Sequence, residues 1–495
     1  MSFKVAFIGA GSVGFTRKLV QDILGVPEFS DIEFSLMDIN AQNLDMIAQL
    51  IARDVNANGL SDVKITTTTD QAEAVHRARY VINVARVGGL EAFATDIDIP
   101  LQYGVDQCVG DTLCAGGIMY GQRGIPMILN LCKDMREHAE PGALLLNYAN
   151  PMAMLTWAAN TYGGVNTVGL CHGVQGGHRQ IADVLGVPQN EVDIVCAGIN
   201  HQTWYVRVLH DGKEVTDSLL DLYEKHPTYS ETEKVRIDVL RHFGYYSTES
   251  NGHLSEYLPW YRKRAEEIKN WISLDTWING ETGGYLRVCT EKRNWFEEDF
   301  PRWMTDEAGE YGPDHRSNEH GSHIIEGLET GRIYRGHFNR INGYTITNLP
   351  TDCVIEAPGY VDQTGIKMTQ VGDLPIGAAA VCNVSINVQR LAVEAAVRAD
   401  VSLLRQAFML DPLTGAVCTT SEICQLVDDM LIAGAPWLPQ YQEAISVAKG
   451  RRESGARVPT REYSGAARLA VKSVKELRDE ESGLNVEARA FRFKQ

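Results

Sequence analysis

The stretch KVAFIGAGSVGF, residues 4–15, decides the fold. An apolar run typical of a buried strand ends in a glycine-rich turn, and a helical pattern, TRKLVQDILGV, follows at once. The glycines have the GxGxxG spacing of a dinucleotide-binding turn. In that pattern Gly9 permits the tight turn, Gly11 lets the backbone approach a pyrophosphate, and Gly14 lets helix and strand pack closely. Ser12 lies at the start of the helix, whose free N–H groups attract phosphate.

A second strand-like run, IEFSLMD, ends in Asp38. An acidic residue at this place binds the ribose hydroxyls of the adenosine, and it argues against the additional ribose phosphate of NADP. Gly9 and Asp38 are further apart than the usual ~20 residues, which a longer first helix and loop would explain. The sequence therefore predicts that NAD is the cofactor.

Two further apolar runs also end in polar residues. YVINVARVGG carries Asn83 and Arg86, and ALLLNYANPM carries Asn147 and Asn150. Each could be a polar cap on a core strand, but ligands bind outside the carboxyl ends of parallel strands, and four such ends favour a binding site. We predict an α/β fold with a Rossmann-type doubly wound parallel sheet. The predicted cofactor-binding residues are Gly9, Gly11, Ser12, Gly14, Asp38 and Asn83.

Composition limits the classes of function. A chain of 495 residues suggests two or three domains, and 46 basic against 64 acidic residues give a net charge of −18, which argues against nucleic-acid binding. We expect no secretory signal and no membrane span, because no apolar run approaches ~18 residues. Ten cysteines without CxxC spacing then indicate reduced thiols in a cytoplasmic protein.

A thiol and two imidazoles follow two strand-like runs in the middle of the chain. VGLCHGVQGG, residues 168–177, contains Cys171 and His172, and CAGINHQTW contains His201. If adjacent strands end at the same edge, Cys171 and His201 meet. One thiolate and one imidazole, with positions left for oxygen, suit a borderline divalent ion that also holds substrate hydroxyls. Taken alone, a buried cysteine and a core histidine would be the more ordinary interpretation.

The motifs taken in order resemble a known family. GAGS, VGDTLCAGGI, NYANPMAM, GLCHGVQG, AGINHQTW and SEYLPWY are similar in order and spacing to the NAD- and manganese-dependent glycosidases of glycoside hydrolase family four. The resemblance covers roughly residues 1–440, and the bacterial α-galactosidases are the most similar branch, through NYANPMAM, TESNGHLSEYLPWY and VSINVQ. It implies a Rossmann domain followed by a mixed α/β catalytic domain, in a homodimer or homotetramer that acts on a small-molecule α-glycoside.

The resemblance also implies roles for individual residues. Cys171 and His201 match the family's ligands of Mn²⁺. Asp111, in VGDTL, matches an acidic residue near substrate and metal, and Asn150 matches an asparagine whose amide reaches sugar hydroxyls. Tyr257, in SEYLPWY, falls where the family has its catalytic base.

Several positions leave roles or the choice of sugar open. His172 could protonate the glycosidic oxygen or bind a sugar hydroxyl, and Arg86 could pair with the carboxylate of a uronic acid. Gly173 stands where many α-galactosidases of the family have serine. The family's GPGG reads CAGG at residues 114–117, and we expect the turn to survive through the two glycines. Glu256 is a second candidate for the base.

The mechanism implied by the resemblance combines redox and elimination steps. NAD⁺ takes hydride from carbon three of the sugar, which leaves a ketone that acidifies the proton on carbon two. Tyr257 removes that proton, and the metal stabilises the enediolate that forms. The aglycone leaves, water adds, and the hydride returns. α-Glucosides and α-linked galacturonides or glucuronides are alternative substrates. An NAD-dependent 2-hydroxy acid dehydrogenase and a non-catalytic NAD-binding regulator are alternatives of a different class.

The chain divides into three expected parts. Residues 1–200 form the NAD-binding domain, residues 201–440 the catalytic and oligomerisation domain, and residues 441–495 a helical extension. Residues 275–320, rich in Trp, Gly, Glu and Asp, are predicted to be a substrate-side loop or subunit contact, with an ordinary surface loop as the alternative.

Overall fold

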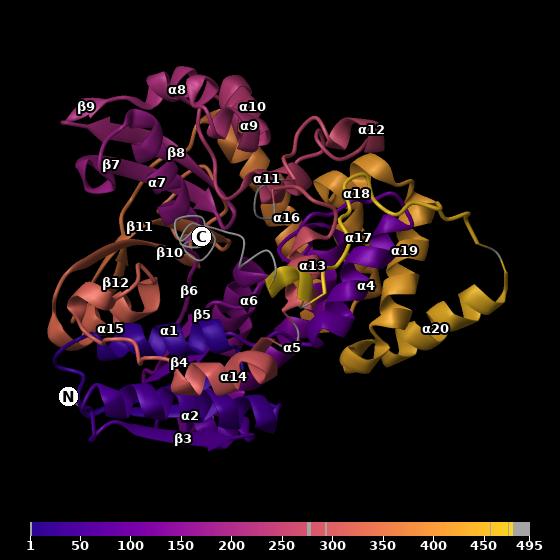
Figure 1. Ribbon diagram of the computed structural model, residues 1–495. Coiled ribbons are helices and arrows are strands. Elements are labelled where there is room, and N and C mark those ends of the chain that lie inside the picture. The colour runs from indigo at the N-terminus through magenta and orange to yellow at the C-terminus, as the bar shows by residue number, and fades with distance from the viewer. Residues whose placement is uncertain (1, 275–278, 293–294, 456, 474, 479–495) are drawn as a thin grey trace.

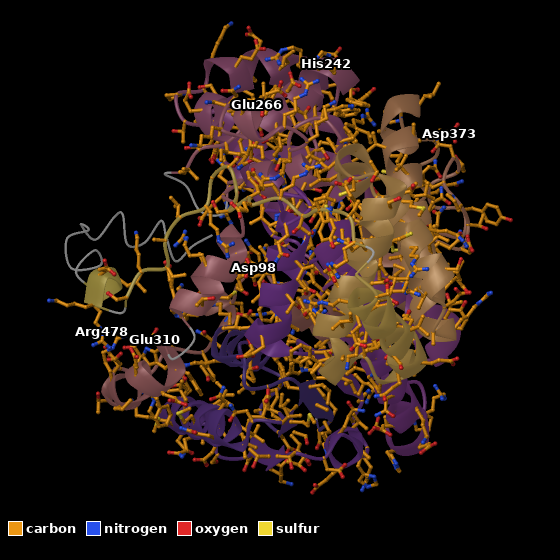
Figure 2. All side chains as sticks on the ribbon, turned by 90° about the vertical axis from the view of Figure 1, so that its right-hand side faces the viewer. Asp98, His242, Glu266, Glu310, Asp373 and Arg478 are labelled. Atoms are coloured by element: carbon orange, nitrogen blue, oxygen red, sulfur yellow. The ribbon has the colours of Figure 1, made fainter. Side chains whose placement is uncertain are left out.

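One mixed sheet runs through the molecule. The computed structural model describes residues 2–274, 279–292, 295–455, 457–473 and 475–478 (Figure 1). Within these residues the strand order is β3-β2-β1-β4-β5-β6-β10-β11-β7-β8-β9, with β12 beside β11. Polar side chains such as His242, Glu310 and Asp373 project from the outer surface (Figure 2).

The amino-terminal half of the sheet is parallel and doubly wound. Chain order reverses beside β1, which pairs with β2 on one side and β4 on the other. This confirms the Rossmann-type prediction. The strands are β1 (Lys4–Ile8), β2 (Glu33–Met37), β3 (Lys64–Thr68), β4 (Tyr80–Asn83), β5 (Leu144–Asn147) and β6 (Thr167–Gly169). The helices are α1 (Val13–Leu24), α2 (Ala41–Ala57), α3 (Gln71–Val75), α4 (Gly89–Leu101), α5 (Cys114–His138), α6 (Met152–Ala158), a π turn (Ala159–Gly163) and α7 (Gly173–Leu185).

Alternate residues of β1 enter two different cores. Ala6 and Ile8 belong to the larger cluster, whereas Val5 and Phe7 belong to the cluster on the other face. All four side chains are buried, as expected for a central parallel strand covered by helices on both faces. The apolar run of the opening motif is therefore explained by burial on two sides.

The second half of the sheet is antiparallel. β10 (Tyr334–Ile341) joins β6 to β11 (Val354–Asp362), and β11 contacts β7 (Val192–Ile199). β7 forms a hairpin with β8 (Gln202–His210), and β9 (Lys213–Glu214) and β12 (Gly365–Met368) complete the sheet. The expected boundary after residue 200 falls in the turn of this hairpin, and the three-part division of the chain stays a prediction.

Helices make up most of the remainder. They are α8 (Leu219–Lys225), α9 (Tyr229–Thr232), α10 (Lys234–Phe243), α11 (Asn251–Tyr257), α12 (Ala265–Ile268), α13 (Gly284–Glu291), α14 (Trp295–Thr305), α15 (His320–Thr330), α16 (Ile376–Arg398), α17 (Val401–Leu410), α18 (Pro412–Val417), α19 (Thr420–Ala433) and α20 (Gln442–Glu453). Short 3-10 turns lie at Gln189–Glu191, Thr216–Ser218, Pro313–His315, Ala435–Trp437 and Pro439–Tyr441.

The helix α16 corrects the expectation that no apolar segment is long enough to span a membrane. By length and composition alone it could cross one. Half of its most apolar window is buried, however, and the helix packs against α5 and α17. Its side chains Cys382, Ile386 and Val393 belong to the larger core. These contacts are those of a core helix.

Two segments differ from the sequence prediction. The predicted loop at residues 275–320 contains α13 and α14, and α14 packs on α2; residues 275–278 and 293–294 lie outside the described part. In the predicted helical extension, α20 and residues 475–478 are helical, whereas residues 457–472 between them run across the protein without regular structure. There Tyr463 and the backbone N–H of Ala466 donate to Asp106, so tertiary hydrogen bonds replace those of a helix.

Candidate active site

The glycine-rich turn is held by close backbone contacts. Gly9 has φ +86°, and a Cβ there would lie 2.6 Å from Cα of Ala85. The N–H of Gly11 donates to Oδ2 of Asp38 at 2.8 Å, and a Cβ on Gly11 would lie at the same distance from that oxygen. The position of Gly9 therefore requires glycine, whereas a side chain at Gly11 would have to displace the Asp38 carboxylate. Asp38 lies against the turn as the motif predicts.

The structure gives the surroundings of three other predicted cofactor residues, whose role in NAD binding stays a prediction. A Cβ on Gly14 would meet no described atom within 4 Å, so helix–strand packing does not require this glycine. Ser12 is exposed at the N-cap of α1, and its side chain makes no capping hydrogen bond. Asn83 is fully buried; it donates to Asn147 Oδ1 and accepts from the N–H of Ala85. Its side chain joins the ends of β4 and β5.

A thiol, an imidazole and a carboxylate meet at one point. Cys171 follows β6, His201 lies in the β7–β8 turn with φ +63°, and Glu249 lies just before α11. One possible ligand atom from each lies within 4.8 Å of the others. The expected meeting of Cys171 and His201 occurs, but the expectation that their strands are adjacent is wrong. An antiparallel hairpin turn carries His201, and β10 and β11 lie between β6 and β7.

The electrostatics of this group favour a cation. Burial, together with the nearby carboxyls of Glu249 and Glu356, raises the pKa of the Cys171 thiol well above its usual range. Burial also lowers the pKa of His201, against the raising effect of the Glu249 carboxylate. For Glu249, burial is outweighed by the facing rings of His201 and His253, which lower its pKa to about 2. A nearby positive ion would turn the thiol into a thiolate ligand.

The second nitrogen of His201 faces the Asp111 loop. Nδ1 lies 3.0 Å from the Thr112 hydroxyl, which donates to Oδ1 of Asp111 at 2.9 Å. Oδ2 of Asp111 accepts from the amide of Asn150 at 2.9 Å. Arg86 lies 3.8 Å from that same oxygen. Asp111 therefore connects the predicted substrate residues to the predicted metal ligand.

Arg86 is held in an aromatic cage. Its guanidinium carbon lies 4.5 Å from the ring centre of Phe93, 4.9 Å from Tyr120 and 5.6 Å from Tyr285. Its side chain is still 26% exposed. Cation–π contacts fix such a group without neutralising it, so Arg86 presents a positive charge beside Asp111.

Tyr257 lies against His201 at the end of α11. Its hydroxyl is 3.5 Å from Nδ1 of His201, and the two rings are parallel with centres 6.5 Å apart. Burial raises the pKa of Tyr257 well above its usual range, and the charges of Glu256, Asp111 and Glu249 raise it further. The phenol therefore needs a nearby positive charge before it can act as a base.

Glu256, the second candidate for the base, holds a loop of the backbone. Its carboxylate accepts the N–H groups of Cys108, Val109 and Gly110 at 2.7, 3.0 and 3.0 Å and is fully buried. These bonds fix the loop that carries Asp111, and they leave Glu256 unsuited to be the base.

His172 and Gly173 lie at the rim of the site. The His172 side chain is 60% exposed, with Nδ1 3.7 Å from Glu319. A Cβ on Gly173 would lie 2.8 Å from Cγ of Glu249. The glycine therefore leaves room for the stem of Glu249.

The CAGG turn is held differently from the expectation. Cys114, not a glycine, takes the positive φ of +60°, and its thiol lies 2.9 Å from the carbonyl of Glu256. Cβ atoms on Gly116 and Gly117 would lie 2.5 and 2.4 Å from backbone atoms of Gly110 and Thr112. The two glycines permit close approach of the helix to the Asp111 loop.

Glu249, Thr112 and His253 were missed as site residues. Glu249 and His253 occur in TESNGHLSEYLPWY, which supported the resemblance without drawing attention to either. Thr112 directly follows Asp111. Their proximity to His201 depends on contacts between distant segments, which a single sequence does not display.

Sequence comparison decides the family. The model of the family 4 glycosyl hydrolases matches residues 4–187, and that of their C-terminal domain matches residues 196–414. The chain belongs to glycosyl hydrolase family 4. This confirms the resemblance on which the site residues were assigned, and the chain is a glycosidase by membership of the family.

Two relatives of this family 4 glycosyl hydrolase are similar over nearly their full length. An α-galactosidase of Rhizobium meliloti (strain 1021) is 58% identical, covering 98% of this chain and 99% of that protein. An α-galactosidase of Bacillus subtilis (strain 168) is 34% identical, covering 89% and 100%.

Solved structures of other family 4 enzymes share the fold. A 6-phospho-α-glucosidase from gut microorganisms, in complex with NAD and glucose-6-phosphate, has a TM-score of 0.73 at 23% identity, covering 89% of this chain and 99% of that one. The Thermotoga maritima 6-phospho-β-glucosidase with manganese, NAD⁺ and glucose-6-phosphate has a TM-score of 0.69 at 24% identity, covering 88% and 99%.

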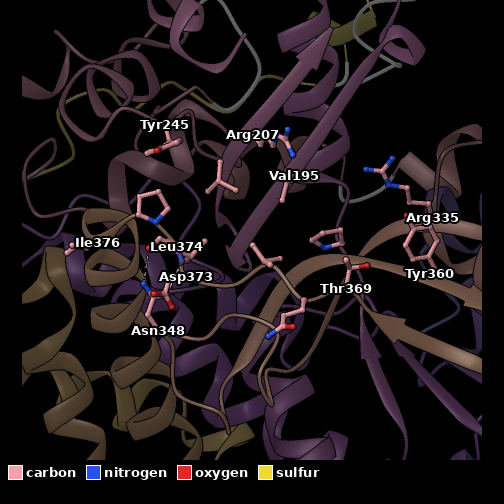
Figure 3. Close-up of a pocket in the computed structure, with 15 residues that line it drawn as sticks. Val195, Arg207, Tyr245, Arg335, Asn348, Tyr360, Thr369, Asp373, Leu374 and Ile376 are labelled. Atoms are coloured by element: carbon pink, nitrogen blue, oxygen red, sulfur yellow. Dashed lines mark hydrogen bonds between the residues drawn. The ribbon is translucent and has the colours of Figure 1, made fainter. Parts of the chain in front are cut away.

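A separate cavity of about 640 Å³ lies between β7, β8, β11 and the segment before α16 (Figure 3). Arg207, Tyr245, Arg335 and Tyr360 are among its lining residues. The lining includes none of the predicted site residues, so this cavity is distinct from the candidate active site.

Proposed function

We propose that this family 4 glycosyl hydrolase cleaves terminal α-galactosides with NAD and a divalent cation, with Mn²⁺ as the first choice. The observation that carries the proposal is the pair of Cys171 and His201, whose possible ligand atoms lie within 4.8 Å of each other beside Asp111, Asn150 and Tyr257. The two α-galactosidase relatives and the solved structures that contain NAD and manganese support it.

The residues of the site fit both the divalent cation and NAD. Cys171, His201 and Glu249 offer sulfur, nitrogen and oxygen, a mixed set that suits a borderline divalent ion. Oε2 of Glu249 is buried without a hydrogen-bond partner among the described residues, so it remains available as a ligand. For NAD, Gly9 and Gly11 allow close backbone approach, and Asp38 lies where ribose hydroxyls are bound.

The chain's residues would orient the sugar and move one proton. When bound, NAD would accept and return hydride at carbon three, and the cation would polarise the adjacent sugar oxygens. The amide of Asn150 and the carboxylate of Asp111 would hydrogen-bond sugar hydroxyls. Tyr257 would take the proton from carbon two, because its hydroxyl lies beside His201 and a bound cation would lower its raised pKa.

His172 is assigned a role at the leaving group. Its exposed position at the rim, beside Glu319, suits contact with the aglycone or its oxygen better than coordination of the cation. An imidazole there would hydrogen-bond or protonate the glycosidic oxygen.

α-Galacturonides are the second candidate substrates. Arg86 keeps a positive charge beside Asp111 and is 26% exposed, so it could receive a sugar carboxylate. The resemblance to α-galactosidases over the whole chain places the neutral sugar first.

We also propose that the protein is a cytoplasmic homodimer or homotetramer. Tyr344 and Ile376 are 77% and 88% exposed, and Ile376 borders the separate cavity (Figure 3), so apolar surface is available for self-association. A cytoplasmic location would keep Cys171 reduced. Analytical ultracentrifugation tests the assembly, and a monomeric mass at micromolar concentration would contradict it.

The function is tested by an omission series. Nitrophenyl α-galactoside, α-glucoside and α-galacturonide are each assayed with NAD⁺, Mn²⁺ or the thiol reductant left out in turn, and nitrophenol and NADH are followed together. We expect cleavage of the α-galactoside that requires all three additions and no net NADH. Cleavage that survives removal of NAD⁺ and metal, after carried-over cofactor is stripped, would contradict the proposal. Net NADH would indicate a dehydrogenase.

A further inference from the structure

The family resemblance assigns no role to Glu249, although its side chain lies in the candidate active site. Its side chain is 17% exposed, and Oε2 lies 3.2 Å from Nε2 of His201. That oxygen has no hydrogen-bond partner among the described residues. A buried carboxylate oxygen without a donor is costly unless something positive satisfies it.

The hydrogen bonds of Thr112 fix which nitrogen of His201 carries the proton. The Thr112 hydroxyl has one hydrogen, and the carboxylate of Asp111 can only accept, so this hydrogen points to Asp111. The Thr112 oxygen must then accept from Nδ1–H of His201, 3.0 Å away. Nε2 is therefore the ring nitrogen of His201 that is left to face Glu249.

Nε2 of His201 and Oε2 of Glu249 therefore face each other across 3.2 Å, and a cation bound between them would take both as ligands. Two ligand atoms bound at ~2.1 Å from one ion are separated by roughly 3.0 Å at octahedral angles and by roughly 3.4 Å at tetrahedral angles. The observed 3.2 Å lies between these two separations, and the thiol of Cys171 completes the group within 4.8 Å.

Charge and space agree with this arrangement. A thiolate and a carboxylate together carry two negative charges, which balance a divalent ion, whereas Cys171 and His201 alone would leave one positive charge uncompensated. Gly173 keeps the space for Glu249, because a Cβ there would lie 2.8 Å from its Cγ. Nδ1 of His253 lies 3.5 Å from Oε2 of Glu249. The same nitrogen is hydrogen-bonded to the Ser250 hydroxyl at 2.8 Å, so it does not serve as a dedicated partner of the carboxylate.

We propose that Glu249 is a third protein ligand of the divalent cation, beside Cys171 and His201. The inference rests on the proposed metal site and deepens it. Three ligands would hold the cation before the sugar binds and would leave its remaining positions for sugar oxygens. Glu249 would therefore determine the affinity for the cation in the absence of substrate.

The test is a titration of Mn²⁺ into the full-length protein without NAD or sugar, at pH 7 with reductant. Free Mn²⁺ is measured by its aqueous electron paramagnetic resonance signal. Glu249→Gln keeps the size of the side chain and should raise the Kd for Mn²⁺ by about 10- to 100-fold. Cys171→Ser tests the site itself and should weaken binding at least as much. Glu356→Gln is the matched control, because it alters a buried carboxyl beside Cys171 outside the ligand group, and its Kd should equal that of the wild type.

A second variant separates ligation from charge. Glu249→Asp keeps the negative charge but shortens the side chain by one methylene group. If Glu249 is a ligand, the Kd for Mn²⁺ should rise in this variant. If Glu249 acts only through its charge, the Kd should be unchanged. Co²⁺ provides an independent readout: in Glu249→Gln the thiolate-to-cobalt absorption band should remain while the ligand-field bands change. Circular dichroism verifies that each variant is folded.

The outcomes are distinguishable. Wild-type affinity in Glu249→Gln together with loss in Cys171→Ser would overturn the role of Glu249 and leave the proposed function standing. The absence of Mn²⁺ binding by the wild type would overturn both. Equal loss in Glu249→Gln and in the Glu356→Gln control would show a general disturbance of the pocket and would also overturn the assignment.

Discussion

The hydroxyl of Thr112 lies 3.0 Å from Nδ1 of His201. The same hydroxyl donates to Asp111, which accepts from Asn150. One hydrogen-bonded chain thus runs from the residues assigned to the sugar to the imidazole assigned to the cation. In this series of hydrogen bonds Asp111 accepts from the Thr112 hydroxyl, and Thr112 in turn orients the His201 imidazole. This positioning role is additional to any contact of Asp111 with substrate.

Thr112→Val should break this chain while preserving the shape of the side chain. Without the acceptor for Nδ1–H, the imidazole loses its orientation, so we expect kcat to fall and the Kd for Mn²⁺ to rise, each by about 10- to 100-fold. Steady-state kinetics and Mn²⁺ titration measure the two effects. Thr112→Ser keeps the hydroxyl and should retain both properties; equal loss in Ser and Val variants would refute the hydrogen-bond explanation.

Gly9→Ala should selectively impair NAD binding. The added methyl group would lie 2.6 Å from Cα of Ala85 at a φ of +86°, so the turn must distort. We expect the Kd for NAD⁺ in fluorescence titration to rise by at least about tenfold, with Mn²⁺ binding unchanged.

Gly14→Ala is the matched control for folding, because its methyl group meets no described atom within 4 Å. In a helix this exchange should leave the apoprotein as stable as the wild type or stabilise it by about 0.5–1 kcal/mol; a marked loss of stability in Gly14→Ala would contradict the packing described above.

Glu356 should make the protein less stable as pH rises. Burial raises its pKa from 4.5 to about 8, so between these values the folded state keeps a proton that the unfolded state has lost. Its contribution to stability is full below pH 4.5, decreases by about 1.4 kcal/mol per pH unit above it, and is lost as pH passes 8. Glu356→Gln stays neutral. The difference in Tm between Glu356→Gln and wild type should therefore grow in favour of the variant from pH 5 to pH 8, and a constant difference would contradict the assignment.

Asp106 should hold the carboxyl-terminal segment on the protein. It is buried, contacts Arg262 at 2.5 Å, and accepts from Tyr463 and the N–H of Ala466. Asp106→Ala leaves the buried guanidinium of Arg262 unpaired and should destabilise the fold by about 3–5 kcal/mol. Limited proteolysis should then cut residues 457–472 faster. Tyr463→Phe removes a single hydrogen bond, and an equal effect of that variant would argue against Asp106 as the anchor.

The parallel half of the fold and much of the site were predictable because their signals are local. The GxGxxG turn, Asp38 and the apolar strands each report on a few neighbouring residues, and burial on both faces of β1 gives an unbroken apolar run. Cys171, His201, Asp111, Asn150 and Tyr257 were found through motifs in order, and the structure brings them into one place.

The remaining features depend on contacts between distant segments. Glu249 reaches His201 because the segment before α11 crosses β8 near Thr203, which no local pattern reveals. Cys114 takes a positive φ because its N–H is held by Asp411 and its thiol lies against the carbonyl of Glu256. The path of the tail is set by Asp106 in the same way. Tertiary hydrogen bonds override local preference at each of these places.

The central claim is that Tyr257 removes a proton from carbon two of an α-galactoside during NAD-dependent cleavage. The most direct test is hydrolysis in D₂O with NAD⁺ and Mn²⁺, followed by proton NMR of the released galactose. The account predicts that the released galactose carries deuterium from the solvent at carbon two. It also predicts that the turnover rate of Tyr257→Phe is at most about 10⁻² of the wild-type rate. Galactose that retains its proton at carbon two would contradict the mechanism.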